Sequence, residues 1–314
     1  MKPICLSACL FLAFFFNLFS VEAQGTYLGI DAGYGFPASK QLLTADVTSK
    51  TNTYTNPGSS GSTTSVTNQS APYSMGKGIN AGLFGGYMLT KNLGIELGVG
   101  YLMGLSTSQT TETDKLTSNT VATPGSSTNS TDISTTSFKG SMLRLIPGVR
   151  VQFGNGKIHP YASAGLIVGV LGSITKETVD NNSLTISNST SNTSNTNDDI
   201  WKYSGRISMG FHGALGVTYL FTQKLGFFAE LTSCFQTYSP GKALHTVSTT
   251  NGKDNLAIDT ENLKETDYSS SYTSTTGTGI PTATGSPAQA LYQVFPFSSV
   301  GLTVGLHLAF GNKD

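Results

Sequence analysis

Six charged residues occur at alternating positions within segments that are otherwise apolar or rich in glycine. The alternation predicts that all six point away from the apolar side of their segments, into one shared interior. Charges in an interior persist mainly when they are paired and hydrogen-bonded. We therefore predict an ion-pair network that fills and stiffens a narrow lumen, with a proton or ion pathway as the functional alternative. The residues are Asp31, Glu96, Arg144, Arg150, Arg206 and Glu230.

Catalytic and metal chemistry have less support in the sequence. A side-chain nucleophile needs a base and an orienting group beside it, yet the four histidines are dispersed along the chain. Cys234 is the single cysteine after residue 23, and no cysteines and histidines have the spacing of zinc ligands. We therefore predict that the protein is not an enzyme and has neither a cofactor nor a metal site.

Eight segments position the charged residues. In each of them apolar side chains alternate with glycine, small or polar ones, which places successive residues on opposite faces of a β-strand. The clearest segment runs from Leu93 to Leu105, where seven apolar positions alternate with mainly glycine. The eight segments are residues 27–36, 78–89, 93–105, 142–153, 159–170, 203–219, 225–236 and 299–310.

The connections between these segments alternate in length. Three are short turns at residues 90–92, 154–157 and 222–224, and four are long, at residues 37–74, 106–136, 175–202 and 239–293. Short turns at one rim and long loops at the other are typical of a transmembrane β-barrel. The long segments are rich in Ser, Thr and Asn, and we expect hydrated, mobile loops. The fold predicted is all-β: an eight-stranded antiparallel up-and-down transmembrane barrel with four long extracellular loops.

The composition of the two strand faces favours a membrane barrel over a soluble one. Only 11% of the residues are charged, and 18 basic residues balance 18 acidic ones, which argues against a nucleic-acid partner. One face is Leu, Val, Ile and aromatic residues, whereas the other is small residues interrupted by charges, as a narrow eight-strand lumen requires. Aromatic residues near the strand ends are expected to form two interfacial girdles. They are Tyr34, Tyr87, Tyr101, Phe153, Tyr203, Tyr219, Phe227, Phe235 and Phe310.

The first 23 residues differ from the rest of the chain. Lys2 precedes a nearly continuous apolar run from Ile4 to Phe19, and small residues occupy positions 21 and 23. This pattern predicts a cleaved secretory signal peptide over residues 1–23, followed by one barrel domain over residues 24–314.

The chain resembles the small outer-membrane β-barrel family of the OmpA, OmpX and OmpW type over residues 24–310. The resemblance rests on the order of the segments and on short stretches at residues 82–87, 93–98 and 304–310. It implies a bacterial outer-membrane location, with loops outside the cell and both termini in the periplasm. It also implies that the barrel-assembly machinery reads the last strand through Phe310, although four further residues, 311–314, depart from the family pattern.

Two classes of function are consistent with these observations. The first is a structural or surface-recognition role in the envelope or in adhesion, and the second is a narrow channel for small apolar or zwitterionic solutes, as in OmpW-like proteins. We expect a monomer whose partners include outer-membrane lipid and lipopolysaccharide. Lys77 and Lys139 are placed either to meet anionic headgroups or to be solvated lysines at the edges of the loops. The sequence identifies no ligand for the long loops.

Overall fold

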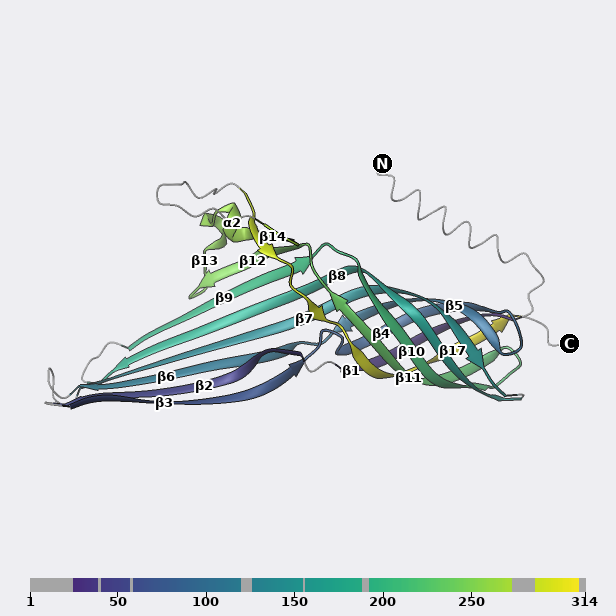
Figure 1. Cartoon of the computed structure of the whole chain (residues 1–314), viewed down its shortest axis with the longest axis horizontal. Helices are drawn as coiled ribbons and strands as arrows, with labels where there is room; N and C mark the ends of the chain where they lie inside the picture. The colour runs from purple at the N-terminus through teal and green to yellow at the C-terminus, as the bar shows by residue number, and fades with distance from the viewer. Residues whose placement is uncertain are drawn as a thin grey trace.

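A computed structural model describes residues 25–38, 41–56, 59–119, 126–154, 156–187, 192–272 and 286–310 (Figure 1). The predicted signal peptide, residues 1–23, lies outside these ranges. The described chain forms one sheet of seventeen strands, with a 3-10 turn η2 (Leu256–Ile258) and a short helix α2 (Glu261–Lys264). No helix in these ranges is long and apolar enough to cross a membrane.

A ring of antiparallel pairings forms a β-barrel. Strand β1 pairs with β4 on one side and with β17 on the other, and the pairings continue from β4 through β5, β7, β8, β10 and β11 to β17. The bounds are β1 (Thr26–Pro37), β4 (Gly78–Met88), β5 (Leu93–Gly104), β7 (Ser126–Gln152), β8 (Ile158–Ile186), β10 (Ser208–Leu220), β11 (Leu225–Tyr238) and β17 (Ser299–Phe310). Each of these strands contains most of one alternating segment of the sequence, although β10 begins only at Ser208 and β7 and β8 extend well beyond their segments. The whole sheet has seventeen strands rather than eight.

The remaining strands extend the sheet beyond one end of the barrel (Figure 1). We call this extension the outer sheet; it includes residues 126–141 of β7 and 173–186 of β8. Its order is β3, β2, β6, β7, β8, β9, β12, β14 and β15, with β2–β6 and β14–β15 parallel. The added strands are β2 (Gln41–Asn56), β3 (Ser59–Tyr73), β6 (Thr107–Asn119), β9 (Asn192–Ser204), β12 (Lys242–Thr250), β13 (Lys253–Asp254), β14 (Glu265–Ser269) and β15 (Ala288–Leu291). Strand β16 (Phe295–Pro296) pairs instead with the barrel strand β11.

The outer sheet corrects the prediction of four long, mobile loops. The segments 37–74, 106–136 and 175–202 are mainly strands wherever the structure describes them, and 239–293 contains the short strands β12, β13, β14 and β15 together with η2 and α2. Strands β7 and β8 have 27 and 29 residues, so they leave the barrel with free edges on which these segments pair. Threonine, which is frequent there, is β-branched and favours strands. The missing apolar alternation reflects polar side chains on both faces of the outer sheet, not an absence of strands.

The two faces of the barrel wall differ sharply. Outward apolar side chains such as Leu83 and Leu302 are 61% and 62% exposed, whereas inward Phe228 is 2% exposed. Soluble proteins bury such residues, so this ring of exposed apolar side chains needs an apolar surrounding. A second, separate group of buried apolar residues lies where the barrel meets the outer sheet.

Candidate functional site

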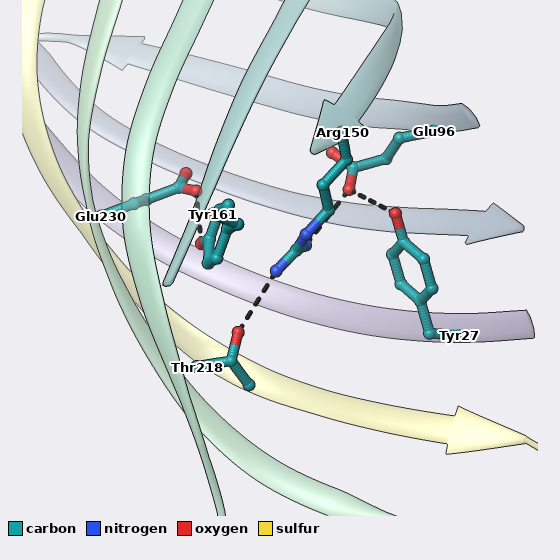
Figure 2. Close-up of polar contacts among 6 residues, drawn as sticks. All are labelled: Tyr27, Glu96, Arg150, Tyr161, Thr218 and Glu230. Carbon is teal, nitrogen blue, oxygen red and sulfur yellow. Dashed lines mark hydrogen bonds and ion pairs between the residues drawn. The ribbon is translucent and has the colours of Figure 1, made fainter. Parts of the chain in front are cut away.

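The part of the lumen nearest the short turns contains an ion pair with two tyrosines beside it (Figure 2). Arg150 Nη1 lies 3.3 Å from Glu96 Oε2, and the Tyr27 hydroxyl donates to the same oxygen at 3.0 Å. Arg150 Nη2 donates to the Thr218 hydroxyl at 3.2 Å. Its guanidinium carbon lies 3.6 Å from the centre of the Tyr161 ring, a cation–π contact. These contacts close the lumen across β1, β5, β7, β8 and β10.

Two inward glycines make room for the tyrosines. Tyr27 on β1 is directly opposite Gly86 on β4, and Tyr161 on β8 is directly opposite Gly216 on β10. In both pairs a Cβ atom on the glycine would collide with the tyrosine ring. This explains the alternation of glycine with large polar residues that the sequence shows on the inward face.

Glu230 and Asp31 have no ion-pair partner in the described ranges. Glu230 accepts a hydrogen bond from the Tyr161 hydroxyl at 2.8 Å (Figure 2). Asp31 lies beside Gly82, where its carboxylate occupies the space that a side chain would fill. Both acids line a cavity of about 100 Å³ in the lumen. Glu96, Arg144, Arg150, His212 and Cys234 also line this cavity.

Arg144 forms a second closure with neutral partners. Its side chain is 3% exposed. Nε donates to Gln236 Oε1 at 3.0 Å, Nη1 to Asn80 Oδ1 at 3.3 Å, and Nη2 to the Phe297 carbonyl at 3.3 Å. The network of paired charges predicted from the sequence therefore contains one ion pair, between Glu96 and Arg150, within the described residues.

Arg206 does not belong to the lumen, contrary to the prediction. Gly205 has a φ of +113°, which ends the regular strand, and residues 205–207 lie between β9 and β10 rather than within one strand. The Arg206 guanidinium is exposed and stacks on Tyr292, with 4.2 Å from its central carbon to the ring centre. The prediction assumed that residues 203–219 form one continuous strand.

The apolar cluster at the mouth of the barrel is a third closure, which the sequence reading missed. Phe297 is fully buried at its centre, and its N–H donates to the Gln236 carbonyl at 2.8 Å. The N–H of Met75 donates to the Pro296 carbonyl at 2.8 Å. Burial raises the pKa of Tyr73 in this cluster to about 12, so its hydroxyl is neutral at physiological pH. The cluster is Tyr73, Met75, Leu102, Phe138, Met142, Ile174, Tyr203, Tyr238, Ala243, Phe295 and Phe297.

The predicted aromatic girdles are only partly outward. Tyr101, Phe153, Tyr219, Phe227, Phe235 and Phe310 are between 39% and 57% exposed, as an outer belt requires. Tyr34 and Tyr87 are half-buried. Tyr203 is wrong as a girdle residue, because it is 7% exposed and packs in the mouth cluster against Phe295.

Several polar residues at the closures were missed because only charges were considered. Tyr27, Tyr161 and Gln236 are on the same strand side as the charged residues, so the alternation contained the signal. No group of three His, Cys, Asp or Glu side chains able to hold a metal occurs among the residues that the structure describes. His245 lies in the outer sheet, with Nε2 3.0 Å from Asp199 Oδ1 and its ring stacked on Trp201.

The family model described as "outer membrane protein beta-barrel domain" matches residues 44–260. The chain belongs to this family. No curated protein matches the chain. Among solved structures, a chain described as "CymD monoaromatic hydrocarbon channel" aligns with 9% identity over 92% of this chain and 90% of that chain, with a TM-score of 0.13. A likeness this weak says nothing about what this outer-membrane barrel protein does.

Proposed function

We propose that this protein spans the outer membrane with the eight strands of the closed ring and presents the outer sheet at the cell surface. Strand β10 has thirteen residues, which at about 3.3 Å each and a tilt of about 40° cover about 33 Å along the barrel axis. This length is sufficient for an apolar band of about 25 Å with both interfaces. The three short turns and both ends of the ring would then lie in the periplasm, and the protein would act as a monomer.

The function that the geometry supports best is surface recognition, in adhesion or in stabilising the envelope. One observation carries this proposal: side chains from different strands meet across the lumen at three levels, whereas β7 and β8 continue out of the barrel and support a sheet. An outer sheet with paired backbone can bind a partner at a lower entropic cost than four flexible loops, because the sheet is already ordered before binding. Neither an enzyme activity nor a cofactor is part of the proposal.

A narrow channel is the second candidate. The cavity of about 100 Å³ between Arg150 and Arg144 favours it, since it is space that a solute or proton pathway would use. Passage would require both arginines and the Phe297 segment to move. Liposome swelling and planar-bilayer recording separate the two functions. We expect no solute-dependent swelling and no stable conductance, and large conductance would instead support the channel.

Cysteine labelling of intact cells tests the topology. The native Cys234 is buried and is expected to react slowly. We expect Ser62→Cys, on exposed β3, to react with a membrane-impermeant maleimide on intact cells, and Lys91→Cys, in a short turn, to react only after the outer membrane is opened. The opposite pattern would contradict the proposed orientation.

An adhesion assay tests recognition itself. Cells that express the full chain and cells that lack it are compared for retention on surfaces coated with mucin, cellulose or collagen. Retention should rise severalfold on at least one coating and fall again when the outer sheet is removed by protease from intact cells. Equal retention on every coating, together with liposome swelling, would favour the channel.

A further inference from the structure

Strand β8 changes its partner near the mouth of the barrel. Strand β8 pairs with β10 up to Gly169, which is opposite Ser208, and with β9 from Ser173, which is opposite Ser204. Between these pairs the chain bulges at Leu171, whose φ is +52°, and turns at Gly205. We call residues 170–172 and 205–209 the seam.

The seam exposes large apolar side chains. Leu171, Ile207 and Met209 are 82%, 66% and 75% exposed, among the highest values on the wall. They continue the outward apolar face of β8 and β10 toward the outer sheet. In the proposed orientation they reach the outer edge of the hydrocarbon, where acyl chains would cover them.

Two cations, Arg206 and Lys242, lie close to the seam. Arg206 is next to Ile207, and its side chain passes over Gly241, where a Cβ atom would lie 3.2 Å from Arg206 Cγ. Lys242, the next residue, is opposite Ser204 on β9 and lies 3.2 Å from Glu265. The Lys242 charge is therefore already paired, whereas the described residues offer Arg206 no ion pair.

The guanidinium of Arg206 lies over the ring of Tyr292, 4.2 Å from its central carbon to the ring centre. Arginine binds phosphate and carboxylate groups through two parallel hydrogen bonds from its guanidinium. Two further exposed cations, Lys139 and Lys202, extend this side of the outer sheet. Each is opposite Thr175 in the cross-strand pairing, and their neighbours Phe138 and Tyr203 point the other way into the mouth cluster.

We infer that the seam is a binding site for one phosphate-bearing lipid of the outer leaflet, with its phosphate on Arg206 and an acyl chain along Leu171, Ile207 and Met209. An exposed cation beside exposed apolar side chains is complementary to a lipid with an anionic headgroup. The inference rests on the proposed outer-membrane topology.

Native mass spectrometry of the full chain, folded in a neutral detergent, tests the site. The probes are diphosphoryl lipid A, the same lipid after removal of its phosphates, and inorganic phosphate. The unchanged chain should retain one tightly bound copy of the phosphorylated lipid and little of the other two. Binding of inorganic phosphate as tight as that of the lipid would overturn the acyl-chain part of the inference.

Two charge-removing variants sharpen the test. Arg206→Gln should weaken binding of the phosphorylated lipid about tenfold, the size expected for losing a charge-assisted hydrogen bond. The matched control is Lys253→Gln, an exposed lysine on β13 of the outer sheet, which should bind as the unchanged chain does. Equal binding by Arg206→Gln and the unchanged chain would overturn the inference.

Membrane insertion is scored separately in the same preparations. A chain that fails to fold into lipid vesicles, judged by heat-modifiable migration in gels, would contradict the proposed topology itself. A chain that inserts normally, but whose Arg206→Gln variant binds lipid unchanged, would contradict only the seam site.

Discussion

The side-chain pattern of strand β8 differs between its part in the barrel wall and its part in the outer sheet. In its lower part Leu166 is 53% exposed on the outward side, while inward His159 and Tyr161 are 3% and 4% exposed. In its upper part, from Ser173, polar residues such as Glu177, Asp180 and Ser183 alternate with few apolar ones. The pairing with β7 continues through both parts, with one irregularity between Ser141 and Leu143. Both parts are paired β-strand, so the difference in side-chain pattern reflects a difference in environment and not in secondary structure.

The two regions also differ in what holds them together. The barrel interior is polar and charged, and its stability depends on closure and hydrogen bonding in a surrounding without water. The outer sheet has mainly polar side chains, and at its base it contributes Phe138, Ile174 and Tyr203 to the mouth cluster. The mouth cluster is therefore the joint through which each region stabilises the other.

We expect substitutions in the mouth cluster to have the largest effect on the free energy of unfolding. Phe297→Ala is expected to lower the free energy of unfolding by about 3–5 kcal/mol, because it opens a cavity in a fully buried cluster. Phe297→Leu keeps most of the volume and should cost less than about 1.5 kcal/mol. Urea unfolding in vesicles measures both, with the fluorescence of Trp201, the single tryptophan, reporting on the outer sheet. Equal losses for the two variants would mean that packing there is loose.

A charged residue introduced into each region tests whether the barrel wall meets hydrocarbon and the outer sheet meets water. Leu83→Arg, at the middle of β4 on the outward face, should lower the free energy of unfolding by about 2–4 kcal/mol, the cost near a bilayer midplane. Ser183→Arg, exposed on upper β8, should change it by less than about 0.5 kcal/mol. If the two substitutions cost the same in vesicles, the outward face of β4 does not meet hydrocarbon.

Removing the ion pair between Glu96 and Arg150 tests how much the lumen contributes to stability. Glu96→Gln leaves Arg150 without its anionic partner, and we expect a loss of about 2 kcal/mol, below the range for fully buried pairs because Glu96 is 21% exposed. Glu177→Gln, an exposed carboxylate on upper β8, serves as the control and should be nearly neutral. Vesicle unfolding followed by circular dichroism gives both values, and a neutral Glu96→Gln would show that Arg150 is held by Thr218 and Tyr161 alone.

The smallest effect is expected in the outer sheet. Asp199→Asn removes the partner of His245, but Asp199 is 34% exposed and such pairs contribute less than about 1 kcal/mol. Trp201 stacks on His245 at 4.3 Å, so its emission should shift although stability hardly changes. A loss above about 2 kcal/mol would show that the outer sheet is stabilised more by this contact than by backbone pairing.

The sequence was sufficient for the barrel strands and the short turns, because each strand has one face toward an apolar surrounding and one toward the lumen. It was insufficient for the outer sheet. Strand β6, for example, reads as a polar tract, and only its pairing with β7 and β2 makes it a strand. Strands exposed to water on both faces leave no periodic apolar signal.

The sequence predicted which strand face most of the site residues occupy, but it did not predict their contacts. Strand parity placed Glu96 and Arg150 inside, but their contact depends on the stagger between β5 and β7, where Arg150 is opposite Gly94. Parity failed for Arg206 because a single left-handed glycine, Gly205, interrupts the chain before it. The closure by Phe297 could not be predicted either, since it depends on a segment that follows a long connection.

The pairing of the first ring strand with the last has a consequence for biogenesis. Thr26 is opposite Phe310, so the wall has two unpaired edges until nearly the whole chain has been synthesised. Contacts this distant in sequence make folding slow, and open strand edges invite aggregation in the meantime. We therefore expect the unpaired strands to need protection from aggregation until β1 pairs with β17.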